Sequence, residues 1–237
     1  MSVLTFCHSE KGGVGKSLAA KVLTDKLIHD GKKVIVLDAD QSNADLHREF
    51  SNIKINEIYI EIYQYDLSQK NGWWDFYNLM AKNKDVEVHI VVSLPAQIES
   101  TMIDQRKELK KALDSLGYTL NMVWMLSEAV DSVQLLKHTT INNKELIHKL
   151  IIVKNGFFAE EDEFSDWQNS NLRNDLLKNE NISEMFLPDL NKRLKRALKP
   201  IKMPFSQALE SGQLDFSERM GLESWLDDAR AVFASIV

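Results

Sequence analysis

The sequence predicts an α/β fold with a mostly parallel, twisted sheet and helices on both of its faces. Short apolar, β-favouring runs alternate with segments whose apolar residues recur at helical spacing, as in repeated βα units. The chain has 237 residues, 44% of them apolar, but only 9 glycines and 4 prolines. This composition supports a large core and excludes collagen-like, low-complexity and turn-rich all-β chains. Because no internal repeat or Pro/Ser-rich linker is present, residues 1–237 are expected to form a single domain.

The first βαβ unit lies at the N-terminus. Val3–Cys7 is a short apolar run that predicts a strand, and a glycine cluster follows it. Apolar residues then recur at helical spacing over residues 18–27, and Gly31 stands where a glycine is expected after a helix C-terminus. Lys33–Asp38 reads as a buried strand, which completes the unit.

The same alternation continues along the chain. An apolar stripe over residues 222–236 predicts a last helix that docks on its own domain. Residues 51–85 fit less well, and we expect them to form a loop or a small insertion beside the core. Their aromatic group, Trp73, Trp74, Phe76 and Tyr77, is expected to pack, with a partner surface as the alternative. Further strands are predicted at 88–93, 120–126 and 150–154, and helices near 101–116, 130–139 and 164–179.

Charge and cysteine content exclude several functional classes. The formal net charge of −6 excludes a histone-like polycation, so nucleic acid could be contacted only through a local basic patch. The single cysteine, Cys7, allows no intramolecular disulfide, and no cysteine pair or HExxH motif is present to hold zinc. The longest apolar runs are about five residues, against ~18 needed to span a membrane. We therefore expect a cytoplasmic protein.

The chemistry-bearing motif is Lys-Gly-Gly-Val-Gly-Lys-Ser at residues 11–17, between the first strand and the first helix. In that position backbone amides and the helix dipole can surround a phosphate. Glycines permit positive φ and remove Cβ atoms that would keep phosphate oxygens away from the amides. Lys16 would reach the β- and γ-phosphates, and the Ser17 hydroxyl would complete a Mg²⁺ shell. The motif therefore predicts binding of ATP or ADP with Mg²⁺.

This motif resembles the deviant Walker A motif of the ParA/MinD branch of P-loop ATPases. A strict P-loop has glycine where this chain has Glu10, whereas Lys11 matches the signature lysine of that branch. The resemblance implies a P-loop NTPase fold and a homodimer in the ATP state, in which Lys11 reaches the partner's phosphates and neutralises developing charge. The nucleotide-binding residues that it implies in the loop are Glu10, Lys11, Gly12, Gly13, Val14, Gly15, Lys16, Ser17 and Leu18.

Two further elements of the branch follow the next strands. Asp38-Ala39-Asp40 resembles switch I, where Asp40 would orient or deprotonate the attacking water and Asp38 would lie near the metal. Gln41 follows directly, without the proline usual in partition members. The Walker B strand leads to Ser93-Leu94-Pro95, with Ser93 where the carboxylate is expected. The catalytic set is thus Lys11, Lys16 and Asp40, the metal set is Ser17, Asp38 and Ser93, and we expect a weak Mg²⁺-dependent ATPase.

Two later stretches extend the resemblance. Residues 126–133 resemble the family's strand-to-helix turn, with Ser or Asp as the helix N-cap. Asn155 resembles a strand-end residue that contacts adenine, and Pro204, within the segment from Met203 to Gly212, resembles the part that closes the base pocket. Ordinary strand-end and turn chemistry explains both stretches equally well.

The output of such a switch is predicted from its charged surfaces. Acidic residues in 220–237 disfavour binding to anionic lipid, and one cysteine cannot hold a metal cluster, so no membrane partner or cluster is expected. A basic segment at 189–202 could bind DNA nonspecifically, although a solvated helix face is an equally good interpretation. The cluster at 106–111 includes Glu108 and resembles an ordinary helix surface. The candidate DNA-binding residues are Lys192, Arg193, Lys195, Arg196, Lys199 and Lys202.

The function predicted from these features is that of a ParA-like dimerisation switch in plasmid partition or conjugative transfer. Its expected partners are a second copy of the chain, DNA, and a DNA-bound or relaxosome-type protein. Two alternatives stay open. One is a metabolic ATP-dependent ligase of the same branch, which would not need Lys11. The other is a nucleotide-binding interaction protein with little hydrolysis, which the serine at position 93 favours.

Overall fold

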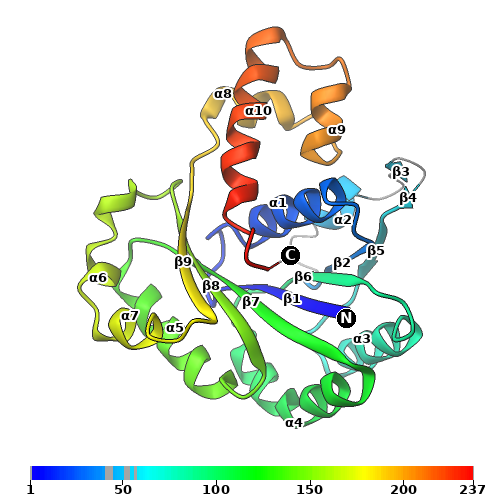
Figure 1. The fold of residues 1–237 in the computed structure, drawn as a ribbon, viewed down its shortest axis with the longest axis vertical. Helices are drawn as coiled ribbons and strands as arrows, with labels where there is room; N and C mark the ends of the chain where they lie inside the picture. The colour runs from blue at the N-terminus through cyan, green and yellow to red at the C-terminus, as the bar shows by residue number, and fades with distance from the viewer. Residues whose placement is uncertain (1, 41–44, 51–53, 56–57, 237) are drawn as a thin grey trace.

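The computed structural model describes residues 2–40, 45–50, 54–55 and 58–236. Its centre is a seven-stranded sheet in which every pairing is parallel, which confirms the predicted fold class (Figure 1). Its strands are, in spatial order, β5 (Glu61–Gln64), β2 (Val34–Asp38), β6 (His89–Ser93), β1 (Ser2–His8), β7 (Tyr118–Leu126), β8 (Ile147–Asn155) and β9 (Ile182–Leu187).

The two faces of the sheet carry separate apolar cores. Within β1, Leu4 and Phe6 belong to one core and Cys7 to the other, because successive side chains of a strand point to opposite faces. Both faces are buried, so the strands read as continuous apolar runs rather than alternating ones. One face is covered by α1 (Lys16–His29), α2 (Asp45–Phe50) and α10 (Phe216–Ala231), and the other by α3 (Lys70–Lys82), α4 (Glu99–Leu116), α5 (Val130–Asn143) and α6 (Ser165–Gln168).

Residues 61–82 differ from the predicted loop or insertion. Residues 61–64 form β5, an edge strand of the main sheet, and residues 70–82 form α3, which packs on the sheet. Trp73 and Phe76 are fully buried, and Trp73 Nε1 donates to Leu67 O at 2.7 Å. Trp74 is 62% exposed, so the aromatic group divides between core and surface. Before β5 lies a short antiparallel ladder of β3 (Lys54–Ile55) and β4 (Ile58–Tyr59).

The prediction of a single helix near 164–179 is wrong. That stretch contains α6 and α7 (Asn171–Leu176), preceded by the 3₁₀ turn η2 (Glu161–Glu163). Ser170 separates the two helices: its Oγ accepts from Arg173 N at 3.0 Å and caps the second one. The edge strand β9 that follows was not predicted, because its partly exposed, mixed sequence lacks a clear apolar run.

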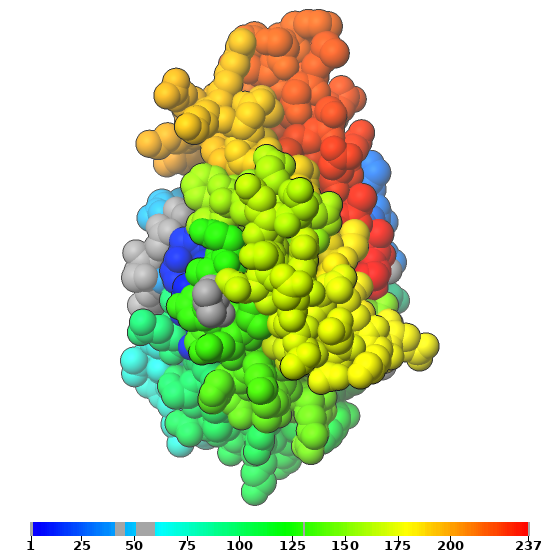
Figure 2. All heavy atoms as spheres, turned by 90° about the vertical axis from the view of Figure 1, so that its left-hand side faces the viewer, coloured from blue at the N-terminus to red at the C-terminus, as the bar shows by residue number. Residues whose placement is uncertain are grey.

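Three helices after β9 form a C-terminal lobe, α8 (Lys192–Leu198), α9 (Phe205–Glu210) and α10. Figure 2 shows this lobe standing above the rest of the molecule. The predicted docking of the last helix is confirmed, since Leu222, Leu226 and Ala229 are buried in the same core as α1. Helix α10 ends at Ala231, before the predicted limit. Within the described residues, none of the helices has the length and apolarity required to cross a membrane.

Candidate functional site

The candidate site lies at the carboxyl edge of the sheet, where the loop between β1 and α1 meets the ends of β2, β6, β7 and β8. Parallel strands bring their carboxyl ends to one edge, so motifs far apart in the sequence converge there. In the register of the sheet, Ser93 is paired with Cys7 on one side and with Asp38 on the other. The three motifs predicted from the sequence are therefore neighbours.

The loop has the backbone conformation that its glycines predict. Gly13 has φ +73° and Gly15 has φ +99°, values that other residues rarely adopt. A Cβ at Gly12 or Gly13 would meet nothing within 4 Å, so the loop is open above these two residues. A Cβ at Gly15 would lie 2.6 Å from Asn155 Nδ2. The loop is thus open to a ligand on one side and tightly supported on the other.

Asn155 supports the loop directly. Its side chain is buried, and Nδ2 donates to Val14 O at 2.9 Å. Its Oδ1 accepts from Phe157 N at 3.1 Å. These two contacts fix the amide between the loop and the turn after β8. The geometry therefore shows a positioning contact to the loop, a role that the sequence did not predict.

Lys16 is enclosed by the loop. It is only 7% exposed, and its Nζ donates to Lys11 O at 2.8 Å. Burial lowers the pKa of Lys16, and the charges of Asp40 and Glu10 oppose this shift without cancelling it. Among the described residues, nearby acids therefore offset only part of the cost of burying this ammonium group. An anionic ligand in the loop would stabilise its charged form.

Lys11 lies on the outer side of the same loop. Its Nζ is hydrogen-bonded and ion-paired to Asp131 Oδ1, in the first turn of α5. The Asp131 carboxylate is exposed, and the bond from Lys11 lowers the pKa of Asp131. The signature lysine is thus held by an acid of its own chain.

The predicted metal ligands meet at the ends of β2 and β6. Ser17 Oγ and Ser93 Oγ are 3.5 Å apart, close enough to share a hydrogen bond. Asp38 is buried, and its carboxylate accepts from His47 N at 3.1 Å and from Asp40 N at 3.4 Å. Burial raises the pKa of Asp38 despite these backbone donors. Asp40 is half-buried beside it, and the switch residue Gln41 lies outside the described residues.

These residues fit a magnesium triphosphate. The open backbone at Gly12 and Gly13 and the buried Lys16 suit phosphate oxygens. The hydroxyls of Ser17 and Ser93 and the carboxylate of Asp38 are hard oxygen donors of the type that Mg²⁺ prefers. With Ser93 in place of a carboxylate, this set carries one negative charge rather than two.

The turn after β7 differs from the prediction. Helix α5 has Ala129 as its N-cap, without a side-chain cap, so the predicted Ser or Asp N-cap is wrong. The Ser132 side chain instead accepts from Ser127 N at 3.2 Å, within the same turn. Asp131 is in the first turn of the helix, where its negative charge interacts favourably with the helix dipole. The same carboxylate is ion-paired with Lys11.

The segment at Pro204 packs on α1. Pro204 is buried and precedes α9, and Ser206 donates to Asp25 Oδ2 from its backbone N at 2.8 Å and from its Oγ at 2.6 Å. Arg230 Nε donates to Asp25 Oδ1 at 2.9 Å. The segment that resembles a base-pocket wall is therefore bonded to the helix that carries Lys16.

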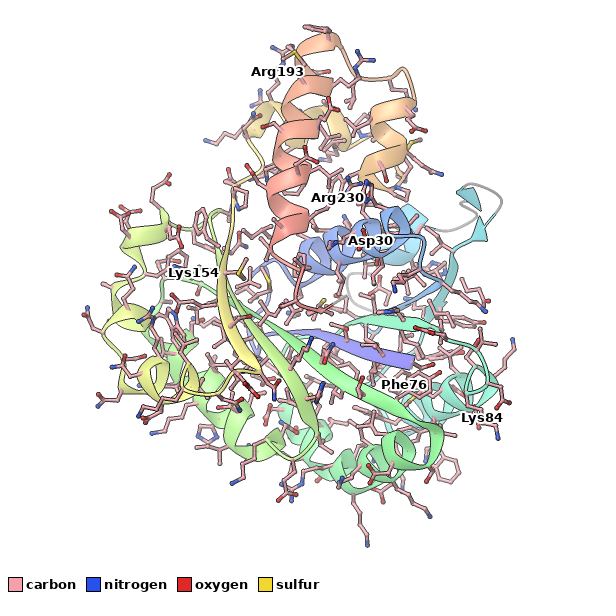
Figure 3. All side chains as sticks on the ribbon, viewed as in Figure 1. Asp30, Phe76, Lys84, Lys154, Arg193 and Arg230 are labelled. Carbon is pink, nitrogen blue, oxygen red and sulfur yellow. The ribbon has the colours of Figure 1, made fainter. Side chains whose placement is uncertain are left out.

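The predicted DNA-binding cluster is only partly available. Arg193 is ion-paired with Asp215 at 2.5 Å and Glu218 at 3.4 Å, and Lys195 with Asp189 at 2.6 Å. Lys195 Nζ also lies 4.3 Å from the centre of the Phe157 ring. Figure 3 places Arg193 near the outer end of the lobe. Among the described residues no ion pair is formed by Lys192, Arg196, Lys199 or Lys202.

A second polar cluster beside the loop was not predicted. His8 is fully buried, with its Nε2 3.6 Å from Glu10 Oε1 and 3.7 Å from Glu99 Oε2. Burial raises the pKa of Glu10. Burial also opposes ionisation of Glu99, but His8 and the donors from α5 outweigh it and lower the pKa of Glu99. The sequence signal was the polar triplet His8-Ser9-Glu10 immediately before the glycines, although Glu99 is far away in the chain.

Comparison with known proteins identifies the family. A family model described as an AAA domain (AAA_31) matches residues 1–135, more than half of the chain. The chain belongs to this family. Among curated proteins, Protein MobD of Acidithiobacillus ferrooxidans is 28% identical over 229 residues, which cover 96% of this chain and 94% of that protein.

Solved structures show the same fold over almost the whole chain. MinD of Aquifex aeolicus has a TM-score of 0.54 at 17% identity, covering 98% of this chain and 97% of its own. A plasmid partition protein of Borrelia burgdorferi B31 bound to AMPPNP has a TM-score of 0.52 at 15% identity, covering 100% and 99%. MinD of Pyrococcus horikoshii OT3 with Mg-ADP scores 0.54 at 13% identity, covering 99% and 97%. This likeness confirms the predicted P-loop ATPase fold.

Proposed function

We propose that this protein binds ATP or ADP with Mg²⁺ and acts as an ATP-dependent dimerisation switch in plasmid partition or conjugative transfer. The observation that carries the proposal is the different position of two lysines in one loop. Lys16 is buried inside the loop, and Lys11 stands on its outer side. An inner lysine suits the phosphates bound by the same chain, and an outer one suits phosphates held by a second copy. The nucleotide complexes of the structural neighbours support the ligand class.

Each loop residue has a defined task in this proposal. Lys16 and the loop amides bind the phosphates, and Asn155 holds the loop in its binding shape through Val14. Asp40 orients the attacking water or takes its proton. Ser17, Ser93 and Asp38 would hold Mg²⁺, which when bound neutralises charge on the phosphate oxygens.

Because Lys11 is bonded to Asp131, dimerisation in this proposal replaces one contact of the Lys11 side chain by another. Lys11 leaves the carboxylate of its own chain and binds the phosphates of the second copy. Because Asp131 is exposed, water replaces the lost partner at low cost. Losing Asp131 therefore favours the dimer, whereas losing Lys11 abolishes it.

Light scattering after size exclusion tests this switch with the full chain. The wild-type protein is expected to be monomeric in ADP and dimeric in ATP. Lys11→Ala should stay monomeric in both nucleotides, and Asp131→Asn should dimerise at lower ATP concentration. Lys21→Ala, which removes a lysine of α1 that is paired with Glu49 of α2, is the matched control and should behave as wild type. A dimer of Lys11→Ala equal to that of wild type would refute the switch.

Nonspecific DNA binding by the lobe is a separate part of the proposal. Its support is the four cations without acidic partners in the described structure, since phosphate contacts need only charge and reach. In gel shifts with ATP, alanine at Lys192, Arg196, Lys199 and Lys202 should weaken binding and reduce its salt dependence. The matched control is alanine at Arg106, Lys107, Lys110 and Lys111 on α4. Equal loss of DNA binding in both quadruple variants, or binding that does not depend on ATP, would refute this part of the proposal.

The serine at position 93 supports a second candidate, a nucleotide-holding interaction protein with little hydrolysis. A hydroxyl there keeps one hydrogen bond to Ser17 but adds no charge at the metal site. Turnover alone separates the two candidates. A phosphate-release assay that finds no steady-state hydrolysis, together with nucleotide binding, would favour the second one.

A further inference from the structure

A buried histidine with two nearby carboxylates lies on the face of the sheet opposite to Ser93, since Ser93 is paired with Cys7 and successive strand residues point to opposite faces. His8 is the last residue of β1, and its ring stacks edge-on against Trp124 of β7, with ring centres 5.0 Å apart. Glu10 begins the loop, and Glu99 begins α4. The three side chains therefore join two elements that are far apart in the sequence.

Within the described residues, the His8 ring makes no hydrogen bond of normal length. Both of its ring nitrogens are inaccessible to water, and neither is bonded to any residue that the structure describes. Its Nε2 faces both carboxylates at 3.6 and 3.7 Å, distances beyond the normal range of an N–H···O bond. A buried imidazole without a partner costs free energy, so its position needs an explanation. A group placed between the nitrogen and the two oxygens would supply one.

The spacing fits a shared metal ion. Two ligand atoms that are each about 2.1 Å from one tetrahedral ion lie roughly 3.4 Å apart. The His8 nitrogen and the two carboxylate oxygens all lie within 4.8 Å of one another, with 3.6 and 3.7 Å for the two pairs that include the nitrogen. The Glu10 and Glu99 side chains are each 14% exposed, so both carboxylates are partly in contact with solvent.

The carboxylate of Glu99 is already oriented by its surroundings. Its Oε2 accepts from Thr139 Oγ1 at 2.7 Å, and its Oε1 accepts from Asn142 Nδ2 at 3.0 Å and Asn143 Nδ2 at 3.2 Å. Glu10 Oε1 accepts from Glu99 N at 3.1 Å and keeps further lone pairs free. Such outer contacts are typical of metal ligands, because they hold each ligand in place before the ion arrives.

We propose that His8, Glu10 and Glu99 form a site for a divalent transition-metal ion of the Zn²⁺ class, distinct from the magnesium position at Ser17. One imidazole and two carboxylates suit Zn²⁺ and its neighbours, whereas Mg²⁺ prefers oxygen ligands alone. The ion would tie the start of the phosphate-binding loop to the first turn of α4, four residues after Pro95. Its binding needs no nucleotide, so the site can be present whether or not the dimerisation switch is correct.

The test is a titration of the nucleotide-free, full-length protein with Co²⁺ and Zn²⁺. Wild type is expected to bind one Co²⁺ with a visible absorption band, and Zn²⁺ should displace it. His8→Gln and Glu99→Gln should each weaken binding about tenfold or more. His148→Gln, at an exposed histidine on β8, is the matched control and should bind as wild type. Excess Mg²⁺ should not displace the Co²⁺.

A rescue variant separates loss of a ligand from loss of the fold. His8→Cys supplies a thiolate at the same place, so it should bind Co²⁺ with a sulfur-to-metal absorption band that the glutamine variant lacks. Zn²⁺ should raise the melting temperature of wild type and His8→Cys but not of Glu99→Gln. The proposal is wrong if wild type binds no Co²⁺ stoichiometrically, or if His8→Gln and His148→Gln bind it equally well. In either case the cluster would be a charge pairing between His8 and the two carboxylates.

Discussion

The two ends of α1 hold buried charges in opposite ways. At its first residue, Lys16 is enclosed by the loop, and its hydrogen bond is to a carbonyl oxygen, that of Lys11. Near its last turn, Asp25 is fully buried and accepts bonds from Ser206 N, Ser206 Oγ and the Arg230 guanidinium. Figure 3 shows Arg230 at the base of the lobe and Arg193 near its outer end.

This difference separates a binding region from an anchoring region. The charge of Asp25 is paired and fully hydrogen-bonded inside the chain, so it joins α1 to α9 and α10. In the part of the chain that the structure describes, the acids near Lys16 offset burial only partly, so burial lowers the pKa of Lys16. A buried charge that the fold leaves undercompensated is suited to an external ligand of opposite sign. The same helix thus carries a ligand position at one end and a structural joint at the other.

Replacing Lys16 should produce the largest loss of function with the smallest loss of stability. Lys16→Ala is expected to lower ATP turnover on the order of 10²–10³-fold, because it removes a charge that acts on the transferring phosphoryl group. The melting temperature should stay equal or rise, since a desolvated ammonium is removed. Phosphate release and thermal unfolding measure the two effects, with Lys21→Ala as the control on the same helix. Unchanged turnover would contradict the assignment.

Breaking the ion pair between Asp25 and Arg230 should lower stability more than function. Arg230→Ala leaves Asp25 buried without its cation, so it is expected to lower the free energy of unfolding by about 3–5 kcal/mol. Asp25→Asn with Arg230→Met, which removes both charges, should recover much of this loss. Urea unfolding of Asp25→Asn, of Arg230→Met and of the double variant that combines them measures the coupling. Additive effects would show that the pair is not a buried joint.

A carboxylate placed at the metal position should increase function at the binding end of α1 and reduce stability there. Ser93→Asp is expected to raise ATP turnover about tenfold at low Mg²⁺, because a second negative charge joins Asp38 at the cation. Stability without Mg²⁺ should fall, since the new carboxylate is buried opposite Asp38 and Cys7. Ser93→Asn is the matched control of equal size without charge. Equal turnover in wild type and Ser93→Asp would refute the role given to this position.

The smallest effect is expected at the N-cap of α10, in the outer lobe. Asp215 Oδ1 accepts from Glu218 N at 2.8 Å and from Ser217 Oγ at 2.8 Å, and these donors, with Arg193, lower the pKa of Asp215. Asp215→Ala should lower the melting temperature by roughly 2–4 °C at neutral pH. A depressed carboxyl pKa adds stability only above the unfolded pKa, so the difference from wild type should vanish as pH falls through the folded pKa. A difference independent of pH would contradict this cause, and ATP turnover should not change.

The sequence predicted the fold where local signals agreed with one another. Val3–Cys7 and Lys33–Asp38 are continuous apolar runs next to helical patterns, and both were placed correctly. The prediction for residues 164–179 was wrong because Ser170 caps a second helix in the middle of one apolar pattern. Residues 61–64 and 182–187 failed because edge strands are half-exposed, so their sequences lack the apolar signal of a central strand.

The sequence by itself determined the phosphate-binding loop, since Gly13 and Gly15 need positive φ and only glycine adopts it without strain. It also determined the parallel α/β fold, because apolar runs buried on both faces alternate with helical patterns. Only the tertiary structure decided which distant side chains meet: Lys11 with Asp131, Asn155 with Val14, and His8 with Glu99. Contacts of this kind depend on the order of strands in the sheet, which no local pattern along the chain encodes.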